Sequence, residues 1–122
     1  MSLLLQDIYS ETKNRFQLEL VCGAKGLNRL MNWVYVAEDI ATTDFLHGGE
    51  LIITTGMGKQ ASSGWLSDFI RELFRQGTCG LILNTGMYLS EDDITPEIRN
   101  FCEEHSYPLF TMPWEIHIYD IT

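Results

Sequence analysis

The pattern of apolar and polar positions predicts alternating strands and helices along most of the chain. Runs rich in β-branched and aromatic residues are typical of strands. The run at 33–37 reads Trp-Val-Tyr-Val-Ala without a charged residue, which predicts a strand buried on both faces. The run at 16–21 alternates apolar and polar residues, as a half-exposed strand does. Together, these patterns predict strands at 16–21, 33–37, 51–55, 79–83 and 107–112.

Helical spacing of apolar residues predicts three helices. The clearest apolar stripe begins at Trp65 and is followed by Gly77, a residue that commonly ends a helix. A second helix is predicted from Pro96 to about His105, because Thr95 is a favourable N-cap and proline a favourable first helical residue. A shorter helix is predicted at 4–13.

The order strand, helix, strand, helix, strand between residues 50 and 112 forms two consecutive βαβ units. Such units require right-handed crossovers and a parallel sheet whose faces are covered by helices. A chain of 122 residues can bury one core without metals or disulfides. The sequence therefore predicts a single α/β domain over residues 1–122, with an open, mostly parallel sheet and helices on its faces.

The charge balance narrows the range of partners. The 17 acidic residues outnumber the 8 basic residues and give a net charge of −9, and Lys and Arg do not cluster. Because Lys and Arg supply much of the affinity for phosphates, we do not expect this chain to bind DNA by itself. The sequence also lacks a long apolar run and a signal-peptide pattern, so we expect a cytoplasmic protein without a membrane partner.

Cysteine and histidine spacing gives no sign of a metal site or of catalysis. Cys22, Cys79 and Cys102 are widely spaced and form no C-x-x-C pair, which predicts small buried side chains in a reducing compartment. The histidines have no neighbouring nucleophile and no metal-ligand spacing. We therefore predict no metal, no cofactor and no catalytic residue.

The stretch HGGELIITTGMG at 47–58 invites comparison with nucleotide-binding loops. Residues 56–61 match G-x-G-x-x-A, the dinucleotide fingerprint, but the predicted helix starts too late for its amides to face a pyrophosphate. A phosphate-binding loop needs glycine and a hydroxyl residue where the chain has Ile53 and Gln60. The glycines therefore indicate turns around a buried strand.

Polar residues nevertheless gather where the predicted strands end. Thr54, Thr55 and Asn84 close two neighbouring strands, and Glu38 follows a third. In open α/β sheets, small ligands bind at this edge, and hydroxyl and amide groups suit a neutral polar molecule. We predict these four residues as a ligand-binding site. An alternative is a small-molecule enzyme that uses Glu38 or Glu50 as a base.

Several motifs together resemble one protein family. They are Gly26-Leu27-Asn28-Arg29, Trp33-Val34-Tyr35-Val36-Ala37-Glu38, Gly48-Gly49-Glu50-Leu51, Thr54-Thr55-Gly56, Gly77, Gly80, Asn84, Pro108-Leu109 and Pro113-Trp114-Glu115. In order and spacing they resemble the N-terminal domain of the PucR family, the purine catabolism regulators of bacteria. The chain departs from the family pattern at Asn28, where Asp is usual, and at 29–32, where Arg-Pro-Val-Arg is usual.

The resemblance implies a regulatory domain of a bacterial transcription factor. In that family a helix-turn-helix segment lies far downstream, so DNA binding is expected outside this chain. The resemblance also implies a purine catabolite-like effector and a homodimer. A third reading is an oligomerisation module that binds no ligand.

Overall fold

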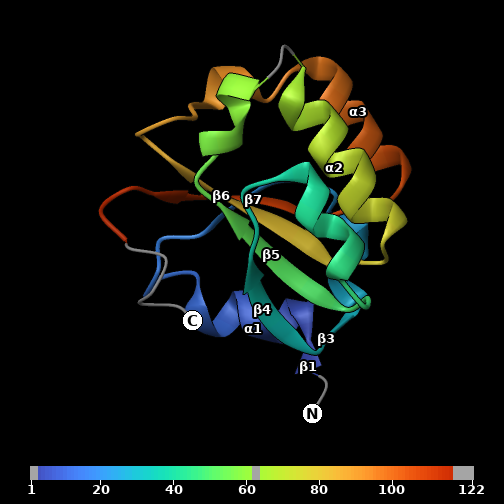
Figure 1. Ribbon diagram of the computed structural model, residues 1–122. Coiled ribbons are helices and arrows are strands. Elements are labelled where there is room, and N and C mark those ends of the chain that lie inside the picture. The colour runs from blue at the N-terminus through green and yellow to red at the C-terminus, as the bar shows by residue number, and fades with distance from the viewer. Residues whose placement is uncertain (1–2, 62–63, 117–122) are drawn as a thin grey trace.

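The computed structural model describes residues 3–61 and 64–116, and it is built around a five-stranded sheet (Figure 1). The strand order is β2-β7-β6-β5-β4, and neighbouring strands are parallel except for the antiparallel pair β2–β7. This arrangement confirms the predicted α/β class. The strands are β2 (Glu19–Cys22), β4 (Trp33–Val36), β5 (Glu50–Thr54), β6 (Gly80–Thr85) and β7 (Leu109–Pro113).

Two consecutive βαβ units form the centre of the sheet, as predicted. Helix α2 (Trp65–Arg75) connects β5 to β6, and α3 (Pro96–Glu104) connects β6 to β7. Because both crossovers step across the sheet in the same direction, α2 and α3 lie on one face and α1 (Leu5–Thr12) lies on the other (Figure 1). The shorter elements are β1 (Leu3–Leu4), β3 (Leu30–Met31) and the 3-10 helices η1 (Ala24–Asn28), η2 (Ile40–Phe45), η3 (Met57–Ala61) and η4 (Glu91–Asp93).

Alternation of side chains along the strands builds an apolar layer on each face of the sheet. The layer under α2 and α3 contains Ile52, Leu81, Leu83 and Leu109. The layer on the α1 face contains Leu51, Ile53, Ile82 and Phe110. All eight are at most 3% exposed. The face to which any strand residue points therefore follows from its place in this alternation.

The prediction that the run at 33–37 is buried on both faces is wrong. Strand β4 lies at the edge of the sheet, and within the described residues it pairs with β5 alone. Trp33 is 60% exposed, Tyr35 42% and Val36 39%. The run has the composition of a central strand, but burial also requires a neighbouring strand on each side, and composition does not reveal neighbours.

The remaining predicted elements shift by a few residues at most. Thr95 caps α3 as predicted, because its Oγ1 accepts a hydrogen bond from the Ile98 amide at 3.3 Å. The strand predicted at 16–21 corresponds to β2, which begins later than predicted, at Glu19. After α1 the chain makes a further turn, in which the Leu18 amide donates to the Lys13 carbonyl at 2.9 Å.

The three cysteines are buried, as predicted. Cys22 is 6% exposed, Cys79 2% and Cys102 0%. Burial raises the pKa of the Cys79 thiol to about 12. A hydrogen bond with Cys22, together with burial, raises the pKa of the Cys102 thiol.

This burial makes a prediction for thiol chemistry. Because the thiolate is the reactive form, we expect at most one thiol per native chain to react quickly with a thiol-specific reagent near neutral pH. After unfolding in guanidinium, all three cysteines should react. Quick reaction of two or more thiols in the native protein would contradict the burial of Cys79 and Cys102.

Candidate functional site

The Glu38 carboxylate lies at the carboxyl edge of the sheet, among donors from the end of β5. It accepts hydrogen bonds from Thr54 Oγ1 and Thr55 Oγ1, both at 2.5 Å. It also accepts from the amides of Thr55 at 2.9 Å and Gly56 at 3.3 Å. The structure therefore brings together three of the four predicted site residues. We call Glu38, Thr54, Thr55 and Gly56 the Glu38 cluster.

The Glu38 cluster fixes the start of the loop that leaves β5. Gly56 has φ of +85°, and a Cβ there would lie 2.2 Å from Leu89 Cγ. A Cβ at Gly58 would lie 2.4 Å from the Glu38 carbonyl oxygen and 2.8 Å from the Trp65 ring. Only glycine permits such close approach at these two positions. The loop therefore packs directly against Leu89 and Trp65.

Asn84 points to the opposite face of the sheet. Thr54 lies beside Leu83 in register, and Leu83 belongs to the layer under α2 and α3, so the next residue along β6 points to the α1 face. The structure therefore does not bring Asn84 together with Glu38. The buried Asn84 Nδ2 instead donates to three main-chain carbonyls near the end of β7, those of Met112 at 3.1 Å, Pro113 at 3.0 Å and Ile116 at 3.2 Å.

A cleft of about 540 Å³ opens at the carboxyl edge of the sheet. We call it the α2/α3 cleft, because the first turns of both helices form its walls together with segments that follow β5 and β6. Small-molecule sites typically measure about 300–1,000 Å³ and, in open α/β sheets, lie at this edge. The apolar lining consists of Trp65, Leu66, Leu89 and Ile98, and the polar lining includes Lys59, Ser67, Asp92, Asp93, Thr95 and Glu97.

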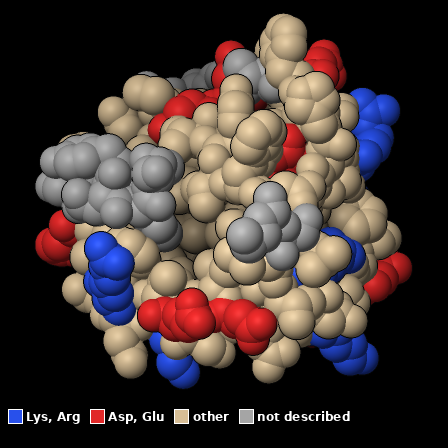
Figure 2. Space-filling view, turned by 90° about the horizontal axis from the view of Figure 1, so that it is seen from below, with Lys and Arg blue, Asp and Glu red and all other residues tan. Residues whose placement is uncertain are grey.

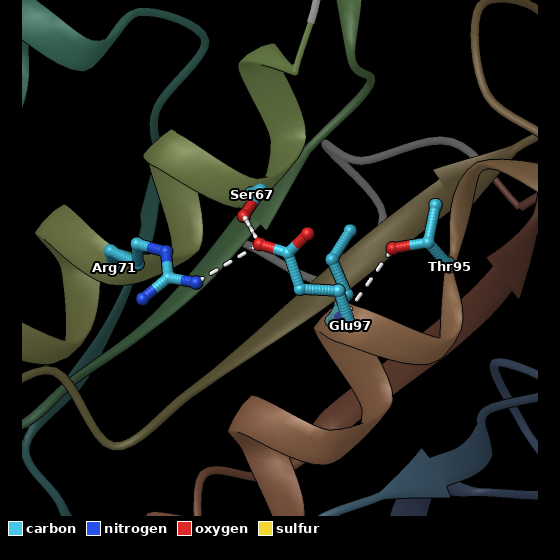
Figure 3. A network of polar contacts seen from close by, with 5 residues as sticks. Ser67, Arg71, Thr95 and Glu97 are labelled. Carbon is cyan, nitrogen blue, oxygen red and sulfur yellow. Dashed lines mark hydrogen bonds and ion pairs between the residues drawn. The ribbon is translucent and has the colours of Figure 1, made fainter.

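Two ion pairs organise the polar rim of the α2/α3 cleft. Lys59 Nζ lies 2.9 Å from Asp93 Oδ1 and 3.2 Å from the Tyr88 carbonyl oxygen, so its charge is already neutralised. Figure 3 shows Glu97 of α3 reaching toward two side chains of α2. Its Oε1 lies 3.0 Å from Arg71 Nη2 and 3.4 Å from Ser67 Oγ. The rim thus offers carboxylates and hydroxyls, which accept hydrogen bonds.

Glu50, considered above as an alternative base, lies at the other end of β5. It is 2% exposed, and its carboxylate accepts hydrogen bonds from the amides of His47 at 2.7 Å and Gly48 at 2.8 Å. The carboxylate therefore closes the turn that leads into β5. In the described ranges, no three His, Cys, Asp or Glu side chains converge as a metal site would require.

The surface charges on the α1 side form no nucleic-acid footprint among the described residues. Figure 2 shows this face, where Lys and Arg lie apart from one another with Asp and Glu between them. Binding to the phosphate backbone requires a continuous basic patch or stripe. In the described part of the chain, no helix combines the length and the apolarity that crossing a membrane requires.

The residues that line the α2/α3 cleft were not predicted from the sequence. The feature of the sequence that could have indicated them is their place after the strands. Lys59 and Ser67 follow β5, whereas Asp92 and Glu97 follow β6. Ligands of open α/β sheets contact the loops beyond the strand ends. The sequence-based prediction instead names residues at the ends of the strands. Most of their polar atoms form hydrogen bonds that hold the loops.

Comparisons with known proteins find matches over most of the chain. A family model described as "Purine catabolism regulatory protein-like family" (PucR) matches residues 7–122. The purine catabolism regulatory protein of Bacillus subtilis (strain 168) is 31% identical over 102 residues, which cover 84% of this chain and 19% of that relative. The chain therefore spans about a fifth of the length of the curated relative that it matches. No solved structure matches the chain.

Proposed function

Because the chain belongs to the purine catabolism regulatory protein-like (PucR) family, we propose that it is the signal-input domain of a bacterial regulator of purine or nitrogen-compound catabolism. In this proposal the domain binds a small effector, and a helix-turn-helix segment downstream of Thr122 binds DNA. The observation that carries the proposal is the α2/α3 cleft, which has the position and size of a small-molecule site.

The lining of the α2/α3 cleft favours one class of effector. The apolar lining residues Trp65, Leu66, Leu89 and Ile98 are each at most 6% exposed, so they form a closed apolar floor and leave most contact with an effector to the polar rim. The exposed Asp92 carboxylate repels anions and can accept hydrogen bonds from N–H groups, whereas Arg71 neutralises the charge of Glu97. We therefore propose an uncharged, N–H-rich effector such as a purine or a ureide.

Direct binding of the effector by Glu38, Thr54, Thr55 and Asn84 stays a prediction. The geometry supports an indirect role for Glu38 and Thr54, because their polar atoms bond to one another and to the loop that leaves β5. In the proposal, the Glu38 cluster holds this loop so that Leu89 and Trp65 can form the apolar lining of the cleft.

A regulatory role is better supported than an enzymatic one. Each of the two carboxylates considered as a base accepts at least two internal hydrogen bonds, Glu38 from the end of β5 and Glu50 from the turn that leads into β5. A general base must instead be within reach of a substrate proton. The family to which the chain belongs is also named for a regulatory protein.

A thermal-shift panel of purines, ureides and related metabolites tests the proposal. An effector at 100 times its dissociation constant should raise the free energy of unfolding by about 2.7 kcal/mol. Asp92→Lys should lower the affinity for such a compound about tenfold or more, because it reverses a charge on the rim of the α2/α3 cleft and removes a hydrogen-bond acceptor.

Glu91→Lys is the matched control for this experiment. Glu91 is an exposed carboxylate on the same turn η4, but it does not line the α2/α3 cleft. We expect this variant to leave the affinity within about twofold, since surface substitutions that touch no ligand usually have small effects. A panel without hits, or equal weakening by both variants, would refute the proposed site.

A further inference from the structure

The outer edge of β4 has the features of a protein contact surface. Within the described residues β4 pairs with β5 alone, so its other edge offers backbone N–H and C=O groups to a new strand. Edge strands that remain exposed usually carry Lys, Pro or a bulge. Strand β4 reads Trp-Val-Tyr-Val and keeps an unbroken register with β5, so it has none of these protections.

A further apolar side chain extends this surface beyond the strand. Phe45, at the end of η2, is 75% exposed. The chain returns from Phe45 to β5 at Glu50, which stands opposite Trp33 in register, so Phe45 lies toward the Trp33 end of β4. We call the exposed set the β4 surface: Trp33, Tyr35, Val36 and Phe45.

The β4 surface is large enough to contribute the apolar centre of a stable interface. Aromatic side chains bury about 150–250 Å² each, so Trp33, Tyr35 and Phe45 at their observed exposures offer roughly 350 Å² together. A standard interface buries about 800 Å² per partner. Val36 and the backbone edge of β4 add to the aromatic part.

We propose that β4 pairs antiparallel with β4 of a second copy of this chain, which joins two five-stranded sheets into one. A two-fold axis brings the same strand of each copy together, so the surface must be complementary to itself. The residues of the β4 surface carry no charge, so no like charges meet at its centre although each chain has a net charge of −9. An uncharged surface also offers nothing to a partner selected by its charge.

Sedimentation velocity over a concentration series tests this pairing. The wild-type chain should reach a dimer, and the dissociation constant should fall as salt is added, because salt screens the repulsion between two copies of charge −9. Trp33→Lys and Tyr35→Lys should each raise the dissociation constant about tenfold or more, since each adds one positive charge from each copy to an uncharged interface.

Met87→Lys is the matched control, because Met87 is an apolar side chain of 57% exposure outside the β4 surface. This variant should dimerise as the wild type does. Amide hydrogen exchange of the wild type gives a test without substitutions, in which the amides of 33–36 that point away from β5 should become better protected as concentration rises. A monomer at every concentration, equal effects of all three variants, or β4 exchange that is independent of concentration would overturn the proposal.

The pairing does not depend on the proposed effector, and every measurement is made without one. If the chain did not dimerise, the proposed ligand site in the α2/α3 cleft would not be refuted. A panel without hits would likewise not refute the proposed pairing through the β4 surface.

Discussion

We expect Glu38→Ala to lower the free energy of unfolding by about 3 kcal/mol, although Glu38 is a half-buried surface residue. The substitution removes the acceptor of four hydrogen bonds from the Glu38 cluster. The Thr54 hydroxyl is fully buried and finds no water to replace the carboxylate. Urea unfolding followed by tryptophan fluorescence measures the change, which corresponds to a fall in melting temperature of roughly 10 °C.

Glu11→Ala controls for the loss of a surface carboxylate. Glu11 is an exposed residue of α1, and its replacement should change stability by no more than about 0.5 kcal/mol. If Glu38→Ala were as mild as Glu11→Ala, the cluster would not hold the loop that leaves β5. The proposal that the Glu38 cluster helps Leu89 and Trp65 to form the lining of the α2/α3 cleft would then have no support.

Asn84→Asp should cost about 4 kcal/mol near pH 8, the largest loss that we predict. The Asn84 Nδ2 donates to three carbonyl oxygens, and Asn84 is 2% exposed. Aspartate keeps the size of the side chain but directs a negative oxygen at the same three carbonyls. Burial without a positive partner raises the pKa of the new carboxyl in the folded state.

The pH dependence of this loss has a definite sign. A carboxyl whose folded pKa lies above its unfolded value destabilises the protein increasingly as pH rises through the interval between the two values. The difference in stability between wild type and Asn84→Asp should therefore be smaller near pH 5 than near pH 8. Urea unfolding at the two pH values measures it.

Asn100→Asp makes the same chemical change at an exposed position of α3 and should alter stability by less than about 0.5 kcal/mol at either pH. A loss that is equal at both pH values, or no larger than that of the control, would contradict the buried donor role of Asn84.

The central part of the fold was predictable because local and long-range signals agree there. The local patterns in this part of the chain all favour the same structure. They are the apolar stripe of α2, the Thr95 cap of α3 and the buried runs of β5, β6 and β7. Two βαβ units in sequence then leave little choice of topology. The glycines of 47–58 likewise serve as turn and contact residues.

The place of β4 was not predictable in the same way. Its apolar run matches that of a central strand, and only the strand order shows that one side lacks a neighbour among the described residues. If the proposed dimer forms, the second copy supplies that neighbour. The composition of 33–36 would then reflect burial in the assembly.

Ligand binding by Glu38, Thr54, Thr55 and Asn84 stays a prediction, but the places of these residues at the edge of the sheet can be compared with the structure. Glu38, Thr54 and Thr55 meet as expected for residues at adjacent strand ends. Asn84 does not join them, because one step along a strand reverses the face to which a side chain points. The cleft residues lie farther along the loops, where the chain path is not readable from periodicity.

Glu38 connects the two surfaces discussed here. It follows β4 by two residues, and its carboxylate holds the loop whose glycines contact Leu89 and Trp65. The β4 surface and the α2/α3 cleft therefore flank the same short segment of chain.

An amide chemical-shift titration of the ¹⁵N-labelled chain with hits from the metabolite panel tests the central claim most directly. The account predicts shifts centred on residues that line the α2/α3 cleft: Lys59, 64–67, Leu89, Asp92, Asp93, Thr95, Glu97 and Ile98. Spectra that no compound of the panel changes, or shifts confined to positions away from this cleft, would contradict it.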